Sequence, residues 1–209
     1  MYKRANLLFS DLKRLERIVS SEQRPVQIVL AGKAHPQDGA GMELARRIFR
    51  WAQRPQLQGR VVVLEEYDMH IGRILTSGCD VWLNTPRRPY EACGTSGMKV
   101  PLHGGVNCSI ADGWWPEAFD GRNGWIIGSK TPGSWGTGAR AERAEDRADA
   151  ADLYDTLEHE VAVEFYDRSK RDGLPRKWIK RALHSTATVV PQFNSHRMVK
   201  EYARRGYGA

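Results

Sequence analysis

The sequence has few cysteines and no long apolar run. Its three cysteines, Cys79, Cys93 and Cys108, are odd in number and lack a CxxC spacing, which argues against a disulfide framework and against a zinc site. Reduced thiols of this kind are typical of a cytoplasmic protein. No apolar run approaches the roughly 20 residues that cross a bilayer, and no signal-peptide pattern is present. We therefore expect a cytoplasmic protein with no membrane segment and no metal site.

The chain also lacks any nucleic-acid-binding motif, although its net charge is +7. The basic residues are mixed with acids, as in RAERAEDRADAAD, and the densest basic cluster is PRKWIKR at residues 175–181. A nucleic-acid partner would favour a one-sided basic surface. The charge pattern favours an anionic small ligand, or an acidic partner surface, over nucleic acid.

What the sequence does contain is an alternation of strand and helix patterns, and no internal repeat. Because the strands are short, apolar and separated by helices, we predict an α/β fold with a doubly wound, Rossmann-like parallel sheet covered on both faces. Strands are predicted at residues 25–32, 60–67, 79–84 and 107–111, and helices at 5–19, 44–52, 69–76, 150–168, 175–188 and 195–205.

Two domains follow from this pattern. The alternation ends near residue 148, after a Gly/Ser-rich and then charged stretch at 128–146 that is predicted to be a surface loop leading into a helix. We predict a cofactor- and sugar-phosphate-binding domain at 1–148 and a helical extension at 149–209. The opening MYKRANLLF resembles the carboxyl end of a strand, so we expect the first domain to be cut at its amino end.

The predicted strands end near several polar residues. Lys33, Tyr67, Thr85 and the loop at 91–99 each follow a predicted strand. Ligands of doubly wound folds bind at the carboxyl ends of the strands. This convergence indicates a binding site.

The loop YEACGTSGMKVPLHGG is the most distinctive stretch. Gly94, Thr95, Ser96 and Gly97 precede a helical segment and could hold a phosphate through amides and hydroxyls, although they match neither a Walker A motif nor GxGxxG. The alternative is a plain surface loop. Lys99 has apolar sequence neighbours, which would favour a neutral, nucleophilic amine; the alternative is an ordinary lysine whose stem packs while its head reaches water.

Other candidates also have two interpretations. Lys3, Arg4 and Lys33 could neutralise a phosphate or be solvated charges, and Glu91 could bind sugar hydroxyls or cap a helix. The stretch ADGWWPE at 111–117 could be a sugar-stacking platform or a core-packing turn. Three histidines lack metal-ligand spacing: His35, His70 and His103.

Several segments, in order, resemble the α-glucan phosphorylases, the glycogen and maltodextrin phosphorylase family, in its short bacterial type. They are YKRANLL, QIVLAGKAHPQD, the run from VVVLEEYDMH to EACGTSGMK, NCSIADGWWPE, YDRSKRDGLPRKWI and PQFNSHRMVKEY. The resemblance is to the carboxyl-terminal part of that family. It implies the second half of a two-domain GT-B glycosyltransferase fold with a helical tail.

The resemblance implies reversible phosphorolysis: an α-1,4-glucan or maltodextrin plus inorganic phosphate gives glucose-1-phosphate and a shortened chain, with pyridoxal phosphate as cofactor. Lys99 matches the lysine that forms the Schiff base with the cofactor. Gly94, Thr95 and Ser96 match the loop that holds its phosphate, and Tyr67 matches a tyrosine beside it.

The substrate residues are implied in the same way. Glu91 matches a carboxylate that binds glucose hydroxyls, and Cys93 stands where better-known members have a serine near the sugar. Lys3 matches a lysine near the cofactor and substrate phosphates, which makes Lys3 and Lys99 the candidate catalytic residues.

One departure is the length, because family members carry a large amino-terminal domain that forms the other wall of the cleft. We therefore expect this chain to be inactive alone, with that domain as its missing partner and the helix at 195–205 left without a surface to pack on; a homodimer is left open. The alternatives are a non-catalytic sugar- or phosphate-binding remnant and, less favoured, a basic nucleic-acid-binding domain.

Overall fold

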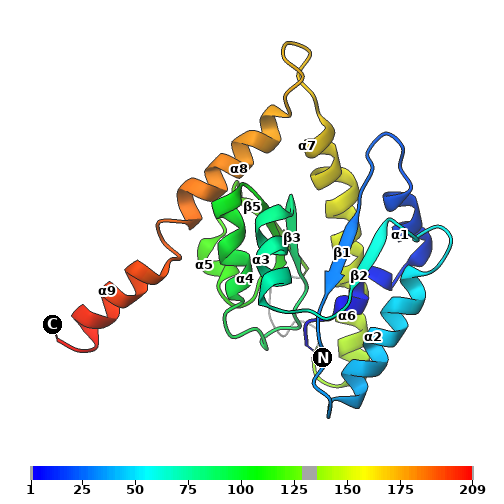
Figure 1. The fold of residues 1–209 in the computed structure, drawn as a ribbon, viewed down its shortest axis with the longest axis horizontal. Helices are drawn as coiled ribbons and strands as arrows, with labels where there is room; N and C mark the ends of the chain where they lie inside the picture. The colour runs from blue at the N-terminus through cyan, green and yellow to red at the C-terminus, as the bar shows by residue number, and fades with distance from the viewer. Residues whose placement is uncertain (1, 129–135, 209) are drawn as a thin grey trace.

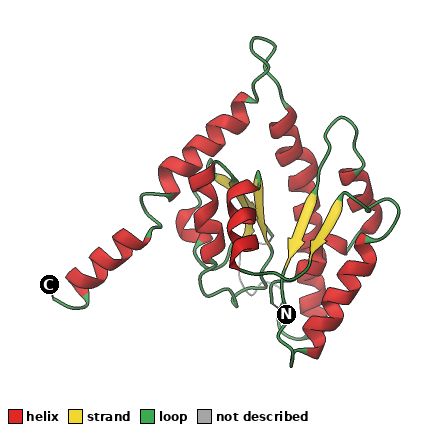
Figure 2. Cartoon of the chain, in the orientation of Figure 1, coloured by secondary structure: helices red, strands yellow, loops and turns green. Residues whose placement is uncertain are grey.

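The computed structural model describes residues 2–128 and 136–208, which form an α/β fold (Figure 1). Its strands form two parallel sheets, with the orders β1–β2 and β3–β4–β5 (Figure 2). The strands are β1 (Ile28–Ala31), β2 (Val61–Leu64), β3 (Val81–Asn84), β4 (Val106–Ile110) and β5 (Gly124–Ile127).

Helices precede the first strand, follow each strand and continue beyond the last one. They are the 3-10 helices η1 (Ala5–Phe9) and η2 (Val100–His103), the π-helical turn η3 (Leu157–Val161), and the α-helices α1 (Leu12–Val19), α2 (Gly39–Ala52), α3 (Met69–Gly78), α4 (Thr95–Lys99), α5 (Trp115–Ala118), α6 (Ala139–Thr156), α7 (Ala162–Tyr166), α8 (Arg176–Val189) and α9 (Ser195–Arg205). No helix in the described ranges has both the length and the apolar character to span a membrane.

Short polar side chains begin four of these helices. Asp11, Asp38, Asp68 and Asn194 each accept a hydrogen bond from the amide three residues further on. Such caps satisfy amides that the first helical turn leaves without partners. The cap at Asp11 also explains why the helix predicted at 5–19 is two elements, η1 and α1.

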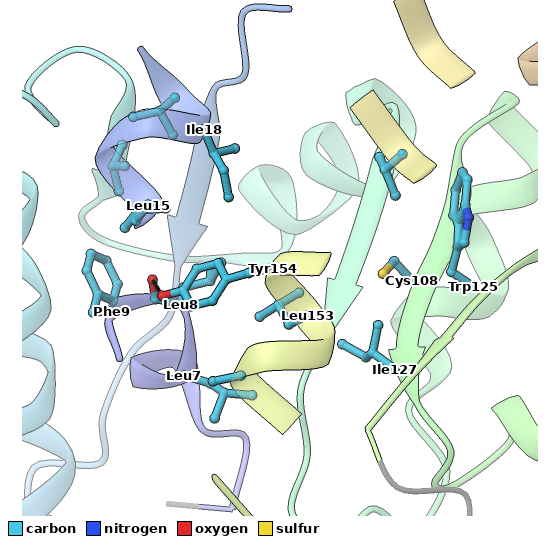
Figure 3. Close-up of a cluster of buried hydrophobic side chains, with 14 of the residues drawn as sticks. Leu7, Leu8, Phe9, Leu15, Ile18, Cys108, Trp125, Ile127, Leu153 and Tyr154 are labelled. Atoms are coloured by element: carbon cyan, nitrogen blue, oxygen red, sulfur yellow. Dashed lines mark hydrogen bonds between the residues drawn. The ribbon is translucent and has the colours of Figure 1, made fainter. Parts of the chain in front are cut away.

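Helix α6 joins the two sheets into one core. It packs against both β5 and η1, and its Leu153 and Tyr154 lie between the sheets (Figure 3). The Tyr154 hydroxyl donates to the carbonyl of Leu8 at 2.7 Å and accepts from the amide of Asp11 at 3.1 Å. The side chain therefore fills apolar space while its polar end stays bonded.

The strand predictions at 25–32, 60–67 and 79–84 each contain an observed strand, the prediction at 107–111 overlaps β4, and all pairing is parallel as predicted. The predicted single sheet is wrong in one respect, because no strand in the described ranges joins β1 to β3. The sequence reading also missed β5 and α5, which are only four residues long.

The region around residue 148 is a continuous helix. Helix α6 begins at Ala139, so the charged part of the predicted loop at 128–146 is helical, while residues 129–135 of that loop lie outside the described ranges. The proposed domain division at 148 falls within α6 and stays a prediction.

Candidate functional site

Glu91 lies at the carboxyl ends of β3 and β4 and is almost fully buried. Its amide donates to Oδ2 of Asp112, which follows β4, at 2.9 Å. Its Oε1 accepts from Nζ of Lys3 at 2.5 Å. Its Oε2 is buried and has no hydrogen-bond partner among the described residues. A buried carboxylate oxygen in this state favours a ligand that brings a donor.

Two glycines allow the backbone to approach this carboxylate. Gly94 has a φ of 87°, and a Cβ at this position would lie 2.7 Å from Oε1 of Glu91. Gly113 has a φ of 59°, and a Cβ there would lie 2.4 Å from the carbonyl oxygen of Cys93. Only glycine combines this backbone conformation with so little space. The predicted glycine loop is therefore packed around Glu91.

Cys93 is held by its backbone and leaves its side chain exposed. Its carbonyl accepts from the amide of Trp114 at 3.0 Å, and the residue as a whole is exposed. Cys93 therefore follows the buried Glu91 by two residues in the chain and does not contribute to the core.

Helix α4 is anchored on β4 through Gly97. The side-chain amide of Asn107 donates to the carbonyl of Gly97 at 2.9 Å, and Trp114 fills the space that a Cβ on Gly97 would need. Thr95 is exposed and Ser96 is half-buried. The contacts of Gly97 thus fix the helix on β4, while Thr95 stays exposed.

Lys99 is the last residue of α4 and is exposed. The apolar surroundings expected from Met98 and Val100 do not form around it, because the buried side chain of Val100 points into the protein instead. The argument for a neutral amine in an apolar pocket is therefore not supported by this structure.

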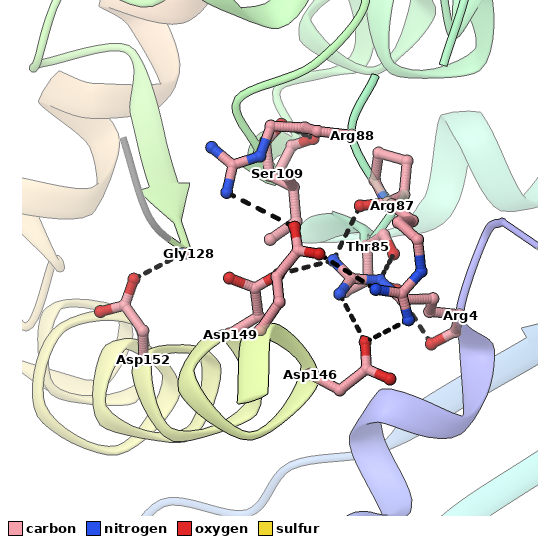
Figure 4. Close-up of polar contacts among 12 residues, drawn as sticks. Arg4, Thr85, Arg87, Arg88, Ser109, Gly128, Asp146, Asp149 and Asp152 are labelled. Carbon is pink, nitrogen blue, oxygen red and sulfur yellow. Dashed lines mark hydrogen bonds and ion pairs between the residues drawn. The ribbon is translucent and has the colours of Figure 1, made fainter. Parts of the chain in front are cut away.

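Lys3 and Arg4 are adjacent in sequence but differ in their contacts. Lys3 bonds to Glu91, and about half of its side chain is exposed. Arg4 is buried and forms ion pairs with Asp146 at 2.8 Å and Asp149 at 2.7 Å (Figure 4). The suggestion that Arg4 binds a phosphate is wrong for this structure, because α6 already neutralises its guanidinium.

The sequence reading missed the polar cluster to which Arg4 belongs. Arg87 pairs with Glu145 at 3.0 Å and with Asp146 at 2.6 Å. The acids lie on one face of α6, and the spacing of Glu145, Asp146 and Asp149 was the available signal. Beside this cluster is an open cavity of about 490 Å³. It is lined by Tyr2, Arg4, Asn6, Arg87, Tyr90, Glu142 and Asp146.

Tyr67 and Lys33 have their contacts with other segments than Glu91. The Tyr67 ring packs against Gly72 of α3, with the hydroxyl 2.7 Å from where a Cβ would be. Lys33 pairs with Glu66 at 3.2 Å, and both side chains are exposed. Since α3 packs against α4, Tyr67 belongs to the same end of the fold. Among the described residues, however, no hydrogen bond or ion pair joins it to Glu91.

The paired tryptophans are core residues. Trp114 and Trp115 are buried and pack with Val189 and Phe193. The sugar-stacking interpretation of ADGWWPE is therefore wrong, and the core-packing alternative is confirmed. Asp112 of this stretch instead binds the amide of Glu91.

One group of potential metal ligands was not predicted. Asp155, Glu158 and His159 bring ligand atoms within 4.8 Å of one another. The guanidinium of Arg14 lies 2.5 Å from both carboxylates, and these two acids hold its pKa above the ordinary value through hydrogen bonds, from Glu158 first and then Asp155. The acids are therefore already paired with a cation.

The sequence of this chain is similar to the sequences of several named proteins. The chain is 46% identical over 206 residues to a glycogen phosphorylase of Mycobacterium tuberculosis, a match that covers 99% of this chain and 23% of the relative. It is 44% identical to a maltodextrin phosphorylase of Thermococcus litoralis (99% and 23%) and 43% identical to a glycogen phosphorylase of Aquifex aeolicus (99% and 28%).

The chain is homologous to a segment of the glycogen and maltodextrin phosphorylases. This confirms the resemblance seen in its sequence. No protein-family profile matches the chain.

The chain spans about a quarter of the length of these phosphorylases. Because the match covers 99% of the chain, it includes both sheets and the helices that follow them. The Glu91 loop is thus part of a phosphorylase-like segment.

Proposed function

We propose that this chain is the cofactor- and sugar-binding part of an α-glucan phosphorylase. The reaction is reversible phosphorolysis, in which inorganic phosphate cleaves an α-1,4-glucan to glucose-1-phosphate and a shortened glucan. The observation that carries the proposal is the match of more than 40% identity along the whole chain to proteins named for this activity.

Glu91 is proposed to bind the glucosyl unit. Its buried Oε2 has no hydrogen-bond partner in the part of the chain that the structure describes, and a sugar hydroxyl is a neutral donor of suitable size. Cys93 follows Glu91 by two residues and is proposed to border the same sugar. A hydrogen bond to a buried charged acceptor stabilises a complex more than one to a neutral acceptor.

The loop and α4 are proposed to hold pyridoxal phosphate. The residues fit such a group in two respects. Gly94 has no side chain that would cover the backbone of the loop, and Lys99 is exposed, so its amine is accessible. Lys99 would attach the cofactor, Thr95 and Ser96 with the Gly94 backbone would hold its phosphate, and Tyr67 would border it. When bound, the cofactor would supply a phosphate group able to exchange a proton with the substrate phosphate.

Lys3 is proposed to supply positive charge to the anionic substrate. Its ammonium group lies at the Glu91 carboxylate, while half of the side chain remains exposed and open to a second anion. Preorganised cations at developing negative charge are a main source of electrostatic catalysis.

We also propose that this chain alone forms little glucose-1-phosphate. The matched phosphorylases are about four times as long, and a reaction through a charged transition state benefits from exclusion of water by a complete cleft. The second candidate function, sugar and phosphate binding without turnover, is favoured by this same difference in length.

The test is attachment of the cofactor to one lysine. The chain is incubated with pyridoxal phosphate, reduced with borohydride, digested and analysed by mass spectrometry. We expect the modification on Lys99 and at least about a tenfold loss of cofactor binding in Lys99→Ala, because no other amine would be held by the loop.

The matched control is Lys200→Ala, which removes another exposed lysine, on α9. If Lys99→Ala and Lys200→Ala retain the same cofactor binding, or the reduced adduct is spread over many surface lysines, the cofactor proposal fails.

A further inference from the structure

The two adjacent tryptophans that follow β4 support different parts of the fold. Both Trp114 and Trp115 are buried. The indole of Trp114 lies against Gly97 of α4, with Cζ2 and Nε1 each 3.2 Å from where a Cβ on that glycine would be. The indole of Trp115 lies instead against Gly124 of β5, and its Nε1 donates to the carbonyl of Trp125 at 3.1 Å. One tryptophan therefore supports helix α4, and the other supports a strand.

Trp114 contacts the loop that enters α4 at two points. Its amide donates to the carbonyl of Cys93 at 3.0 Å, and its indole lies against Gly97. The side-chain amide of Asn107 also bonds to the carbonyl of Gly97, at 2.9 Å. Residues 94–96, which are proposed to hold the phosphate of the cofactor, lie between these two points. Trp114 therefore fixes both ends of that short segment.

A phenylalanine in the turn after α8 packs against the Trp114 ring. The ring of Phe193 meets it edge-on, with centroids 5.0 Å apart and an interplanar angle of 70°. The amide of Phe193 donates to the carbonyl of Val189 at 2.8 Å, and Val189 is fully buried in the same cluster. Since edge-to-face packing is a preferred geometry of aromatic pairs, Phe193 restricts the orientation of the indole.

Helix α8 also contacts the segment that follows Lys99. Its Thr186 hydroxyl donates to the carbonyl of Pro101 in η2 at 2.7 Å, and Pro101 is buried. Lys99 itself is exposed. The backbone around Lys99 is therefore held at residues 97 and 101, while the amine stays accessible.

We propose that Trp114 is a positioning residue for the loop that holds the cofactor, and that Phe193 acts through it by fixing the indole. Both side chains act through the backbone of residues 93–97. Amides and hydroxyls bind a phosphate well only when they converge on it, so a small displacement of the loop weakens binding. The inference rests on the proposed function, because the ligand it concerns is pyridoxal phosphate.

The same apolar cluster supplies a matched control. Phe119 is a second half-buried phenylalanine of this cluster, and it packs against Trp115 with ring centroids 5.5 Å apart. Phe193→Leu and Phe119→Leu therefore make the same chemical change beside different tryptophans. Thermal midpoints of both variants are measured first, so that their losses of stability can be compared.

The test compares the binding of pyridoxal phosphate with that of pyridoxal, which lacks the phosphate. Dissociation constants are measured from ligand absorbance, with binding to Lys99→Ala subtracted as background. We expect Phe193→Leu to lower the preference for pyridoxal phosphate by at least about fivefold, because the displaced loop contacts the phosphate. Phe119→Leu should leave this preference within about twofold of the unvaried chain, since a general loss of stability acts on both ligands alike.

Two more variants complete the series. Phe193→Tyr keeps the aromatic ring and should retain the preference. Trp114→Phe keeps the backbone bond to Cys93 but loses the indole, so it should lower the preference as Phe193→Leu does; it provides a second measurement if Phe193→Leu does not fold.

The inference is overturned if folded Phe193→Leu or Trp114→Phe keeps the full preference, or if the two leucine variants lose it equally. Such results in a chain that binds pyridoxal phosphate through Lys99 contradict the positioning role alone. If the unvaried chain binds pyridoxal phosphate no better than Lys99→Ala does, the proposed cofactor site fails, and the inference fails with it.

Discussion

Glu91 is buried with one oxygen paired and the other unpaired. Lys3 bonds to Oε1, whereas Oε2 has no partner among the described residues. Leaving a buried polar group unsatisfied costs about 1–3 kcal/mol, and more for a charged group. A hydroxyl donor would recover this cost on binding, so affinity for a sugar would arise partly from relief of an unfavourable free state.

The environments of the thiols predict an order of reactivity. Burial raises the pKa of Cys79 to about 11 and raises the pKa of the fully buried Cys108 further. At pH 8 a thiol with the Cys79 pKa is thiolate in only about one molecule in a thousand, and the thiolate is the reactive form. We expect the exposed Cys93 to be alkylated first, Cys79 much more slowly and Cys108 only after unfolding.

Iodoacetamide labelling at pH 8, followed by mass spectrometry of peptides, checks this order. Since a raised pKa lowers the thiolate fraction at every pH below it, Cys79 labelling should increase about tenfold per pH unit between pH 8 and 10. Cys93→Ser is the control that identifies the fast site. Labelling of Cys108 before Cys93 in the folded chain would contradict the structure.

At the residue scale, patterns within a few residues could be interpreted from the sequence, whereas ion pairs between distant residues could not. The glycines and Glu91 stood out because their types and spacing are unusual within a few residues. The pairing of Arg4 with Asp149 joins positions 145 residues apart. No local pattern records such a contact, and Arg4 was therefore interpreted as a candidate phosphate ligand.

At the scale of elements, the Arg4 ion pairs attach the amino-terminal turn to α6. Both Arg4 and Asp149 are buried, so removal of Arg4 takes a buried cation away from the acids of α6. We expect Arg4→Ala to lower the free energy of unfolding by about 3–5 kcal/mol, as measured by urea denaturation.

Two further variants separate burial from charge. The surface control Arg46→Ala, whose partner Glu43 is 3.7 Å away at an exposed position, should change the stability by less than about 1 kcal/mol. The double variant Arg4→Met/Asp149→Leu should be less destabilised than Arg4→Ala, because it removes both charges of this ion pair. Equal small effects of Arg4→Ala and Arg46→Ala would contradict this role.

The elements themselves were predicted where their apolar patterns are clear. Helix α2 was predicted from apolar residues at helical spacing, and strands β1–β4 from short apolar runs. Strand β5 and helix α5 are short, and packing around the buried Trp115 and Trp125 decides their structure. The separation of β1 from β3 into two sheets could not be predicted from the sequence, because strand order depends on the whole fold.

At the scale of the molecule, α9 contributes little to the core. None of its residues is buried, and Met198, Val199 and Tyr202 are exposed. We expect truncation after Asn194 to shift the thermal midpoint by less than about 2 °C, since exposed positions contribute little to stability. Differential scanning calorimetry is the measurement.

Phe193→Ala is the comparison, because Phe193 packs edge-on against Trp114 with ring centroids 5.0 Å apart. This variant should lower the midpoint clearly, whereas the truncation should not. A large loss of stability on removing α9 would show that the helix has packing contacts in solution.

The attachment of Arg4 to α6 also affects the order in which parts of the chain can fold during synthesis on the ribosome. Its acidic partners are 142 and 145 residues further along the chain. At about 5–20 residues per second, they follow Arg4 by roughly 7–30 s. Throughout that interval the guanidinium has to stay hydrated, so the amino-terminal turn cannot be buried in the core. The nascent chain therefore cannot complete its core until α6 has emerged from the ribosome. During this period the facing edges of β1 and β3 would be accessible to chaperones.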